Sequence, residues 1–368
     1  QKVRQLPLLF IPCFNLREFT YASYRLKILL RPVRWSYLNE TPLAQMNNLK
    51  KRIIFSILIC YLMLGCEKLF NDNDSDQLPK PAGKFIPDFG FRIENGSNPA
   101  PFADKDGAIY LFYSDNRYQP PKRFMTTSTD GLNFDNPTEV LDRSRNPFNK
   151  LMPDGKTWRH YQLNWKPDRS EYRINSESST DGIHFKKDEG IRYVPAESDS
   201  GTLGVFDILV VDNAVWLLYV GAIGYSTSNV RLAESNDNGL SFQFLLPNVF
   251  NDSQKGLGYD HRDPRSHILE NGIRVYTMVQ GLKPPHPGHR AVGNIYSFIL
   301  NDTNDFIQED GVRLSHMDFT NYNVWSLNDP WVVTMKNGTH RMYVASLVGI
   351  DSSDVHWSII SATWDPTK

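Results

Sequence analysis

The sequence has 368 residues, enough for one large domain or two of ordinary size. With 40% hydrophobic, 12% aromatic and only 22% charged residues, the composition excludes a disordered chain. The formal net charge is -1, but basic residues are concentrated before residue 67, so the rest is acidic and a nucleic-acid partner is not expected. The three cysteines, Cys13, Cys60 and Cys66, also lie in the first part, which excludes a disulfide framework, a thiol nucleophile and a cysteine-ligated zinc site from the rest.

Residues 46–65 have the pattern of a secretory signal peptide. The basic segment 46–52 is followed by the apolar run 53–64, which is too short to span a membrane, and then by Gly65 and Cys66. Residues 62–66 resemble a bacterial lipobox, which implies lipidation of Cys66 and attachment to the outer membrane at the surface of a Gram-negative cell. The alternative is a buried helix that happens to end in Gly-Cys.

If this interpretation is correct, translation starts at Met46, and residues 1–45 are upstream sequence outside the fold. Residues 66–84 then contain the lipidated cysteine and a polar, acidic segment that is expected to be a flexible tether. Its acidic residues resemble the surface-export signals of Bacteroidota lipoproteins. The alternative is a solvated linker.

Strand signals begin near Phe85 and continue to the end of the sequence. Runs of β-branched and aromatic residues each follow a short turn, and the clearest are 108–113, 214–220, 273–279 and 341–346. No helical pattern of comparable length interrupts them. The sequence therefore predicts an all-β domain.

One short motif recurs and sets the period of this domain. Ser178–Phe185 contains a Ser/Thr pair, Asp-Gly and a Phe; 127–134 repeats the pattern, and 235–242 repeats it with one inserted residue. We expect each Asp to cap its own backbone and each Gly to adopt a positive φ. The three glycines are 51 and 57 residues apart, which indicates a structural repeat.

A unit of about 57 residues fits five times into residues 85–368, and a repeated four-stranded unit is the blade of a β-propeller. The sequence therefore predicts a five-bladed β-propeller, with blades that start near Phe85, Leu151, Gly201, Tyr259 and Phe319. A double sandwich is the alternative. The repeated turns are expected on the outer strands, where their Asp residues serve the scaffold.

Polar residues early in each blade are the candidates for a central site, because the inner strands of a propeller converge there. Three carboxylates, Asp207, Asp263 and Asp329, are predicted at equivalent points of blades three, four and five. Asn98 occupies the corresponding place in blade one, and His160 begins the candidate segment of blade two. The alternative is structural: each Asp caps a turn and ties neighbouring blades through backbone N–H groups.

This combination of Asp-Pro segments and Ser-x-Asp-Gly turns resembles the five-bladed propeller glycoside hydrolases, including families 43, 32, 62, 68, 117 and 130. The resemblance implies hydrolysis of glycosidic bonds by paired carboxylates, with Asp207 and Asp263 as the working pair and Asp329 in support. The chain departs from the family pattern in three ways. The Arg-Asp-Pro segment that begins at Arg262 lies in the fourth blade, although related enzymes carry it earlier. Asn98 stands where the family has an Asp, and Asp207 stands where it has a Glu.

A basic cluster accompanies these carboxylates and suggests an anionic group on the ligand. It consists of His261, Arg262, Arg265 and His267 around Asp263, together with the Pro-rich loop 283–290, which contains His289 and Arg290. Ion pairing between blades is the alternative, and metal binding by the histidines lacks a ligand spacing that would single it out. The resemblance implies no required cofactor and allows a structural Ca²⁺ in the propeller centre. Trp158 and Trp325 are the aromatic side chains expected to stack on a sugar.

Three functions remain open at this point. The first is hydrolysis of a polysaccharide or oligosaccharide at the cell surface by a monomeric, lipid-anchored enzyme. The second is glycan binding without catalysis, which is favoured by Asn98. The third is phosphorolysis, which is favoured by the basic cluster and by a similarity to family 130.

Overall fold

The computed structural model describes residues 83–140, 147–166, 171–199, 202–221, 229–250, 260–270, 272–280, 293–301, 304–349 and 355–368. The chain divides into two units, Gln1–Ser75 and Asp76–Lys368, and every described residue belongs to the second. The predicted signal peptide, Cys66 and most of the tether lie outside the described residues, as do His289 and Arg290. Within the described ranges, no helix is long and apolar enough to cross a membrane.

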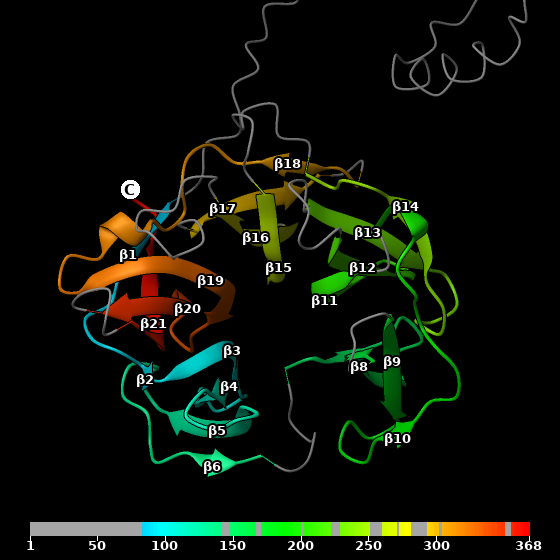
Figure 1. The fold of residues 1–368 in the computed structure, drawn as a ribbon, viewed down its shortest axis with the longest axis horizontal. Coiled ribbons are helices and arrows are strands. Elements are labelled where there is room, and N and C mark those ends of the chain that lie inside the picture. The colour runs from blue at the N-terminus through cyan, green and yellow to red at the C-terminus, as the bar shows by residue number, and fades with distance from the viewer. Residues whose placement is uncertain are drawn as a thin grey trace, which may run out of the picture. The chain divides into compact units, whose positions relative to one another are not determined.

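The described strands form five antiparallel sheets around a common centre (Figure 1), so the chain is the five-bladed β-propeller that the sequence predicts. Blade one contains β3 (Gly96–Ala103), β4 (Ile109–Asp115), β5 (Lys122–Ser128) and β6 (Thr138–Glu139). Blade two contains β7 (Asn149–Leu151), β8 (Trp158–Trp165), β9 (Tyr172–Ser179) and β10 (Lys186–Lys187). Blade three contains β11 (Leu203–Val211), β12 (Ala214–Gly221), β13 (Asn229–Ser235) and β14 (Gln243–Leu246).

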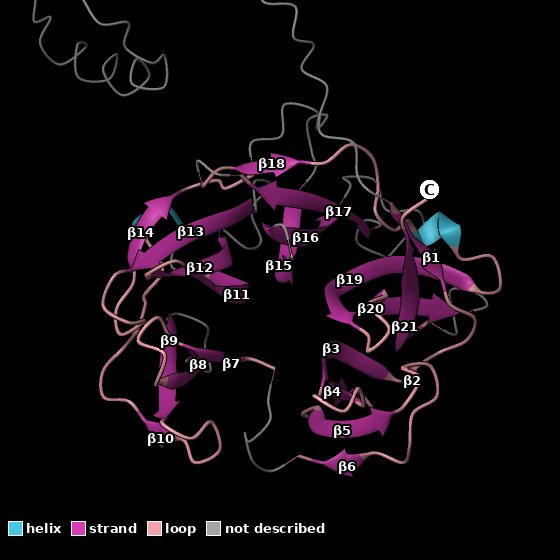
Figure 2. Ribbon diagram, turned by 180° about the vertical axis from the view of Figure 1, so that it is seen from behind, coloured by secondary structure: helices cyan, strands magenta, loops and turns pink. Residues whose placement is uncertain are grey.

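Blade four contains β15 (Asp260–Leu269), β16 (Gly272–Gln280), β17 (Gly293–Leu300) and β18 (Phe306–Gln308). Blade five contains β19 (Asn323–Thr334), β20 (His340–Gly349) and β21 (His356–Asp365), with β1 (Lys84–Pro87) and the short β2 (Ile93–Glu94) paired to β21. Two 3₁₀ turns, η1 (Glu197–Asp199) and η2 (His316–Asp318), lie in connections. Strands alone make up the blades, as the secondary-structure colours of Figure 2 show.

The first strand of the propeller closes the ring. Phe85 on β1 pairs with Trp364 on β21, so β1 is the outermost strand of blade five. The prediction that blade one starts near Phe85 is therefore wrong, and this blade begins at Gly96. A strand pattern in the sequence does not reveal the pairing partner, and the pairing of β1 with β21 joins the first and the last described strands in one blade.

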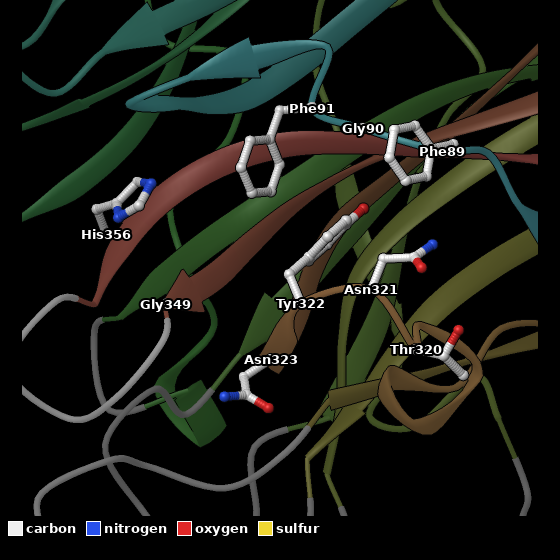
Figure 3. A pocket seen from close by; sticks show the side chains of 9 residues that line it. All are labelled: Phe89, Gly90, Phe91, Thr320, Asn321, Tyr322, Asn323, Gly349 and His356. Atoms are coloured by element: carbon white, nitrogen blue, oxygen red, sulfur yellow. The ribbon is translucent and has the colours of Figure 1, made fainter.

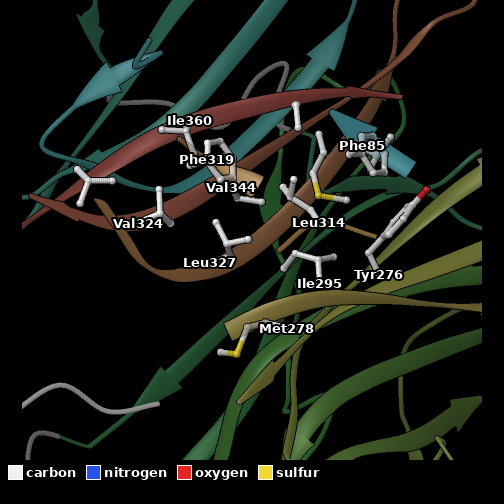
Figure 4. Packing of buried hydrophobic residues seen from close by; sticks show 14 residues of the cluster. Phe85, Tyr276, Met278, Ile295, Leu314, Phe319, Val324, Leu327, Val344 and Ile360 are labelled. Atoms are coloured by element: carbon white, nitrogen blue, oxygen red, sulfur yellow. The ribbon is translucent and has the colours of Figure 1, made fainter. Parts of the chain in front are cut away.

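Apolar side chains from facing sheets hold blade two to three, three to four, four to five and five to one. Figure 4 shows the contact between blades four and five, where Tyr276 and Met278 lie near Leu327 and Val344. Phe85 is fully buried in the same cluster, so the strand that closes the ring also packs into the interface between blades four and five. Burial of an apolar side chain of this size stabilises the fold by about 1.5–3 kcal/mol.

The repeated Asp-Gly turns connect the third and fourth strands of blades one, two and three, on the outer side as predicted. In blade one, Asp130 Oδ1 accepts hydrogen bonds from the backbone N–H of Leu132 and Asn133 at 2.8 Å, and Gly131 has φ +70°. These bonds hold the pKa of Asp130 well below its usual range. Tyr343 of blade five donates a hydrogen bond of 2.7 Å to the Gly131 carbonyl, so the turn also ties two blades. The confirmed role is structural.

A second repeat, which the sequence analysis missed, follows the outermost strand of blades five, two and four. We call these segments the Gly-Arg turns: Asp88–Arg92, Asp188–Arg192 and Glu309–Arg313. The first residue of each carries a carboxylate that accepts a hydrogen bond from a serine on the third strand, and it forms an ion pair with an arginine on the second. These partners are Ser361 and Arg341, Ser176 and Arg159, and Ser297 and Arg274. Their sequence signal, an acidic residue, then Gly two positions and Arg four positions later, is visible without a structure.

Candidate functional site

Three inner strands carry the same bulge at the centre of the propeller. On β15, Arg262 pairs with Met278 and Arg265 with Tyr276, so one extra residue is accommodated there. The bulge contains an Asx-Pro step, and the Asx residues Asn98, Asp263 and Asp329 have φ of 51°, 52° and 49°. Asn and Asp tolerate this left-handed conformation better than other side-chain-bearing residues, and Pro suits a bulge because it leaves a ladder hydrogen bond unmade. Asn98, Asp263 and Asp329 thus occupy equivalent positions in blades one, four and five.

Asp207 is not equivalent to these residues, contrary to the prediction. The bulge of β11 lies between Leu203 and Phe206, so Gly204 takes the place of Asp263, and Asp207 follows three residues later. This bulge has no Asx-Pro step, and the sequence therefore offered no marker for its position.

His160 is also not on an inner strand. It lies on β8, the second strand of blade two, and the inner strand is the short β7. His160 is buried, and its Nδ1 lies 2.9 Å from Asn149 Oδ1 on β7. The prediction failed because β7 has only three residues, too few for a strand pattern.

Asp263 and Asp329 bring two carboxyl groups together between blades four and five. Asp263 Oδ2 accepts a hydrogen bond of 3.2 Å from the backbone N–H of Asp329. Asp263 is buried and Asp329 is partly exposed. Burial raises the pKa of Asp263 above its ordinary value, while the Asp329 amide and the charges of Arg265 and Arg262 act in the opposite direction. Burial and the charge of Asp263 raise the pKa of Asp329 to about 8.

Arg265 lies beside this pair and between two aromatic rings. Its guanidinium carbon is 4.7 Å from the centroid of the Trp331 ring and 5.1 Å from that of Phe148. The two rings meet edge to face with centroids 5.0 Å apart. Side chains from β15, from β19 and from the segment directly before β7 therefore meet here. The Arg265 cation lies against aromatic faces that attract it.

Asp207 contacts the other side of Arg265 and ties blade three to blade four. Its Oδ2 accepts hydrogen bonds from Ser266 N at 2.7 Å and Ser266 Oγ at 2.6 Å, and its Oδ1 lies 3.7 Å from Arg265 Nη1 and 4.0 Å from Lys150 Nζ. Arg265 also donates a hydrogen bond to the Phe206 carbonyl. Asp207 is 3% exposed, and both of its oxygens have partners. This is the geometry of the structural alternative.

Asp207 lines a cavity of about 590 Å³, hereafter the lower cavity, formed by the later halves of the inner strands together with Lys150 and Trp158. Asp263 and Asp329 do not line it. The three predicted carboxylates therefore do not share one place. Asp263 and Asp329 lie at the bulges and Asp207 lies beyond them, and Arg265 interacts electrostatically with all three.

Asn98 is exposed at the bulge of blade one. Its Nδ2 donates hydrogen bonds to Ser97 Oγ at 3.3 Å and Ser114 Oγ at 3.4 Å. A carboxamide cannot accept a proton at neutral pH, but it can donate to and accept from a hydroxyl group. The side chain is suited to holding a polar ligand and not to acting as a base.

Arg123 on β5 is a candidate site residue that the sequence analysis missed. Its guanidinium carbon lies 5.5 Å from the centroid of the Phe148 ring, on which Arg265 also packs. Its Nε and Nη2 atoms are buried without a hydrogen-bond partner, and Nη1 makes no hydrogen bond to any described residue. Burial and the charge of Arg265 lower the pKa of Arg123 to about 10. Nothing in the sequence around Arg123 marks it, because its neighbours are close only in space.

The remaining predicted residues have other surroundings. His261 is buried, with Nδ1 2.9 Å from Thr277 Oγ1 and its ring against Phe250 and Phe298. Trp158 lies at the lower cavity, and its ring is 3.4 Å from where a Cβ on Gly182 would be. Trp325 is buried at 7% exposure. Of the basic cluster, Arg265 and Arg262 carry charges that lower the pKa of Asp263.

A calcium ion takes about six to eight oxygen ligands, whereas Arg265 places a positive charge beside the two carboxyl groups at the centre, so the described residues there do not fit this ion. In the part of the chain that the structure describes, no group of three or more His, Cys, Asp or Glu residues is arranged to hold a metal ion.

No protein-family model and no curated protein matches this chain. Solved structures do. A protein described as a glycoside hydrolase matches with a TM-score of 0.52 and 10% identity, over 77% of this chain and 92% of that one. A thermostable family-43 glycoside hydrolase has a TM-score of 0.51 and 12% identity, over 76% of this chain and 91% of that one.

The chain has the fold of the propeller glycoside hydrolases. Identities of 10% and 12% show a common fold and no more, so the reaction has to be argued from the residues of this chain.

Proposed function

We propose that the chain is a glycoside hydrolase whose reaction takes place at Asp263 and Asp329. The observation that carries the proposal is the pairing of two carboxyl groups at equivalent bulges of adjacent inner strands, both with raised pKa. Glycosidases need one carboxyl group that keeps its proton and one that is ionised. Perturbed carboxyl groups in the centre of a fold are typical of that task.

The surroundings assign different roles to the two residues. Asp263 accepts the Asp329 amide hydrogen bond and faces the charges of Arg265 and Arg262, so the negative charge is better stabilised there. Burial, together with that charge, raises the pKa of Asp329 to about 8, so Asp329 holds its proton at neutral pH. Asp329 is also the more exposed of the two. We therefore assign Asp329 as the proton donor and Asp263 as the ionised partner.

In this mechanism the Asp329 proton passes to the glycosidic oxygen as the bond from that oxygen to the anomeric carbon breaks. Water supplies the oxygen that replaces it, and Asp263 either takes a proton from that water or first attacks the anomeric carbon itself. Arg265 holds the charge of Asp263 in place, and Asp207 is a positioning residue that fixes Arg265. Asn98 binds a sugar hydroxyl.

Incubation of the purified protein with a panel of plant and algal polysaccharides and oligosaccharides tests this proposal. We expect release of reducing sugar from at least one substrate, and a loss of about 10²–10⁴-fold in Asp329→Asn and Asp263→Asn, the range associated with a general acid or base. Asp212→Asn, at an exposed hairpin residue with φ 52°, is the matched control and should keep its activity. No product from any substrate, or equal rates in all four proteins, would refute the assignment.

Glycan binding without catalysis is a second candidate, and Asn98 favours it because blade one then contributes an amide where blades four and five contribute carboxyl groups. Binding that leaves every glycan intact, with unchanged affinity in Asp329→Asn, would establish it. Phosphorolysis is a third, favoured by Arg123 because an unpaired guanidinium can bind phosphate. Turnover that requires inorganic phosphate and yields a sugar phosphate would establish that one.

We further infer that the protein is a monomeric lipoprotein, anchored through Cys66 at the cell surface, where an extracellular polysaccharide can reach it. The sequence of residues 46–66 supports this location. Mass spectrometry of the native N-terminus should find a lipidated Cys66, and an unmodified peptide that contains residues before Cys66 would rule the anchor out.

A further inference from the structure

The three Gly-Arg turns provide an internal comparison. In each, the glycine has a positive φ (Gly90 81°, Gly190 81°, Gly311 75°), and the arginine side chain donates to the carbonyl of the residue before that glycine. The arginine N–H also donates a hydrogen bond of 2.7 Å to the carbonyl of an isoleucine on the third strand. Backbone and arginine thus build the same turn three times.

The residue before the glycine differs among these turns. It is exposed in all three, and it is Glu189 in blade two, Asp310 in blade four and Phe89 in blade five. Two acidic residues show that the turn itself needs no aromatic side chain here. Phe89 is nevertheless 81% exposed, the largest exposed fraction among the large hydrophobic side chains in the described ranges. Its presence needs a reason other than the fold.

Phe89 borders a cavity of about 630 Å³ on blade five, hereafter the rim cavity. The cavity lies where β19 and β21 begin and β20 ends, because Asn323, His356 and Gly349 are at those strand ends. Figure 3 shows its lining, in which the rings of Phe91 and Tyr322 lie side by side with centroids 4.7 Å apart. The volume is in the range of small-ligand sites.

The lining specifies the chemistry of the ligand. Its described residues are Phe89, Gly90, Phe91, Thr320, Asn321, Tyr322, Asn323, Gly349 and His356, with no Lys, Arg, Asp or Glu among them. Thr320 and Asn321 are exposed and make no side-chain hydrogen bond to any described residue. Aromatic faces bind C–H surfaces, and amide and hydroxyl groups bind hydroxyls. A neutral sugar offers both.

The rim cavity is separate from the carboxyl pair. Asn323 precedes Asp329 by six positions on β19, which its bulges shorten to a distance of roughly 15 Å at about 3.3 Å per residue. One sugar ring cannot occupy both places, so a ligand at the rim cavity is either a distant part of a long chain or a separate molecule.

We propose that the rim cavity is a second carbohydrate-binding site for a neutral polysaccharide, with Phe89 as the stacking ring and Asn321 as a hydrogen-bonding partner. It retains the polymer on blade five independently of cleavage at the centre. The site therefore does not depend on the proposed hydrolase activity.

Affinity electrophoresis in gels that contain arabinan, galactan, xylan or mannan measures this binding. We expect at least one polysaccharide to retard the protein, and Phe89→Glu, which places the residue of the blade-two turn in blade five, to weaken the affinity at least tenfold. Asn321→Ala should weaken it several-fold. Glu189→Phe is the reciprocal control and should add no binding, because Glu189 lines neither the rim cavity nor the lower cavity.

Thermal unfolding of Phe89→Glu should match that of the parent protein, and Phe89→Ala serves if it does not. Absence of retardation by all four polysaccharides, or equal retardation in Phe89→Glu, would overturn the proposal. A dimer that Phe89→Glu dissociates, without any sugar binding, would also overturn it and identify a protein contact. Retardation that persists in Asp329→Asn and disappears in Phe89→Glu supports the rim site even if no polysaccharide is cleaved.

Discussion

The Gly-Arg turns and the central bulges both contain carboxyl groups next to arginines, but these groups differ in their hydrogen-bond partners. In the blade-four turn, Glu309 accepts three hydrogen bonds, from Arg274 Nε at 2.7 Å, Arg274 Nη2 at 2.9 Å and Ser297 Oγ at 2.6 Å. At the centre, the Asp329 side chain accepts no hydrogen bond from a described residue, and Arg123 has no acidic partner among the described residues. Paired charges serve stability, and polar side chains without a hydrogen-bond partner in a fold's interior indicate a place where a ligand can bind.

The largest expected effect is a loss of stability in Glu309→Gln, which removes the carboxylate of a Gly-Arg turn. Glu309 and Arg274 are 2% and 6% exposed, so removal of the negative charge leaves a buried cation without compensation. Breaking such a pair costs about 3–5 kcal/mol, and we expect a loss of that size in the free energy of unfolding by urea. Activity per folded molecule should not change, because the turn lies on the outer strands. Replacement of both partners, Arg274→Met with Glu309→Leu, should cost less than the single change, and a larger cost would contradict the explanation.

Asp329 should respond to pH in the opposite direction from an ordinary paired carboxylate. Its pKa rises from 3.8 to about 8 on folding, so between these values the folded protein binds more protons than the unfolded chain. The stability contributed by this group is fully present below its unfolded pKa, and it is lost as pH rises through about 8. The free energy of unfolding by urea, measured between pH 5 and pH 9 in steps of about one unit, should decline in the parent protein. The decline should be shallower in Asp329→Asn. The same slope in both proteins would mean that Asp329 is ionised throughout.

The contrast also explains which features could be predicted. Blade number followed from the spacing of Gly131, Gly182 and Gly239, because a turn that needs a positive φ leaves a local mark in the sequence. Asp263 and Asp329 were found for the same reason, since their Asx-Pro steps mark a bulge. The acidic-x-Gly-x-Arg signal of the Gly-Arg turns was present and was missed.

Features that depend on pairing partners left no local mark. The place of Phe85 in blade five follows from closure of the ring, and the offset of Asp207 follows from a bulge built with Gly204. Arg123 is significant only because Phe148 and Arg265 lie beside it. In each case a contact between distant segments decides the role, and no single stretch of the chain contains that contact.

The smallest change in stability is expected from Arg123→Met, and this variant can be compared directly with Arg274→Met. Arg274 is neutralised by Glu309, whereas Arg123 bears a charge that burial and Arg265 both disfavour, as its lowered pKa of about 10 indicates. Methionine keeps the unbranched stem on the Phe148 ring and removes that charge, so stability should stay the same or rise by up to about 1 kcal/mol. Arg274→Met, the matched control, should instead be destabilised, because it leaves Glu309 buried and alone. Asp142 lies outside the described residues and is the nearest acidic residue in sequence after Glu139. If Arg123→Met lost several kcal/mol and Asp142→Asn lost the same amount without additivity, Arg123 would be one more paired cation, and the distinction between the turns and the centre would not extend to it.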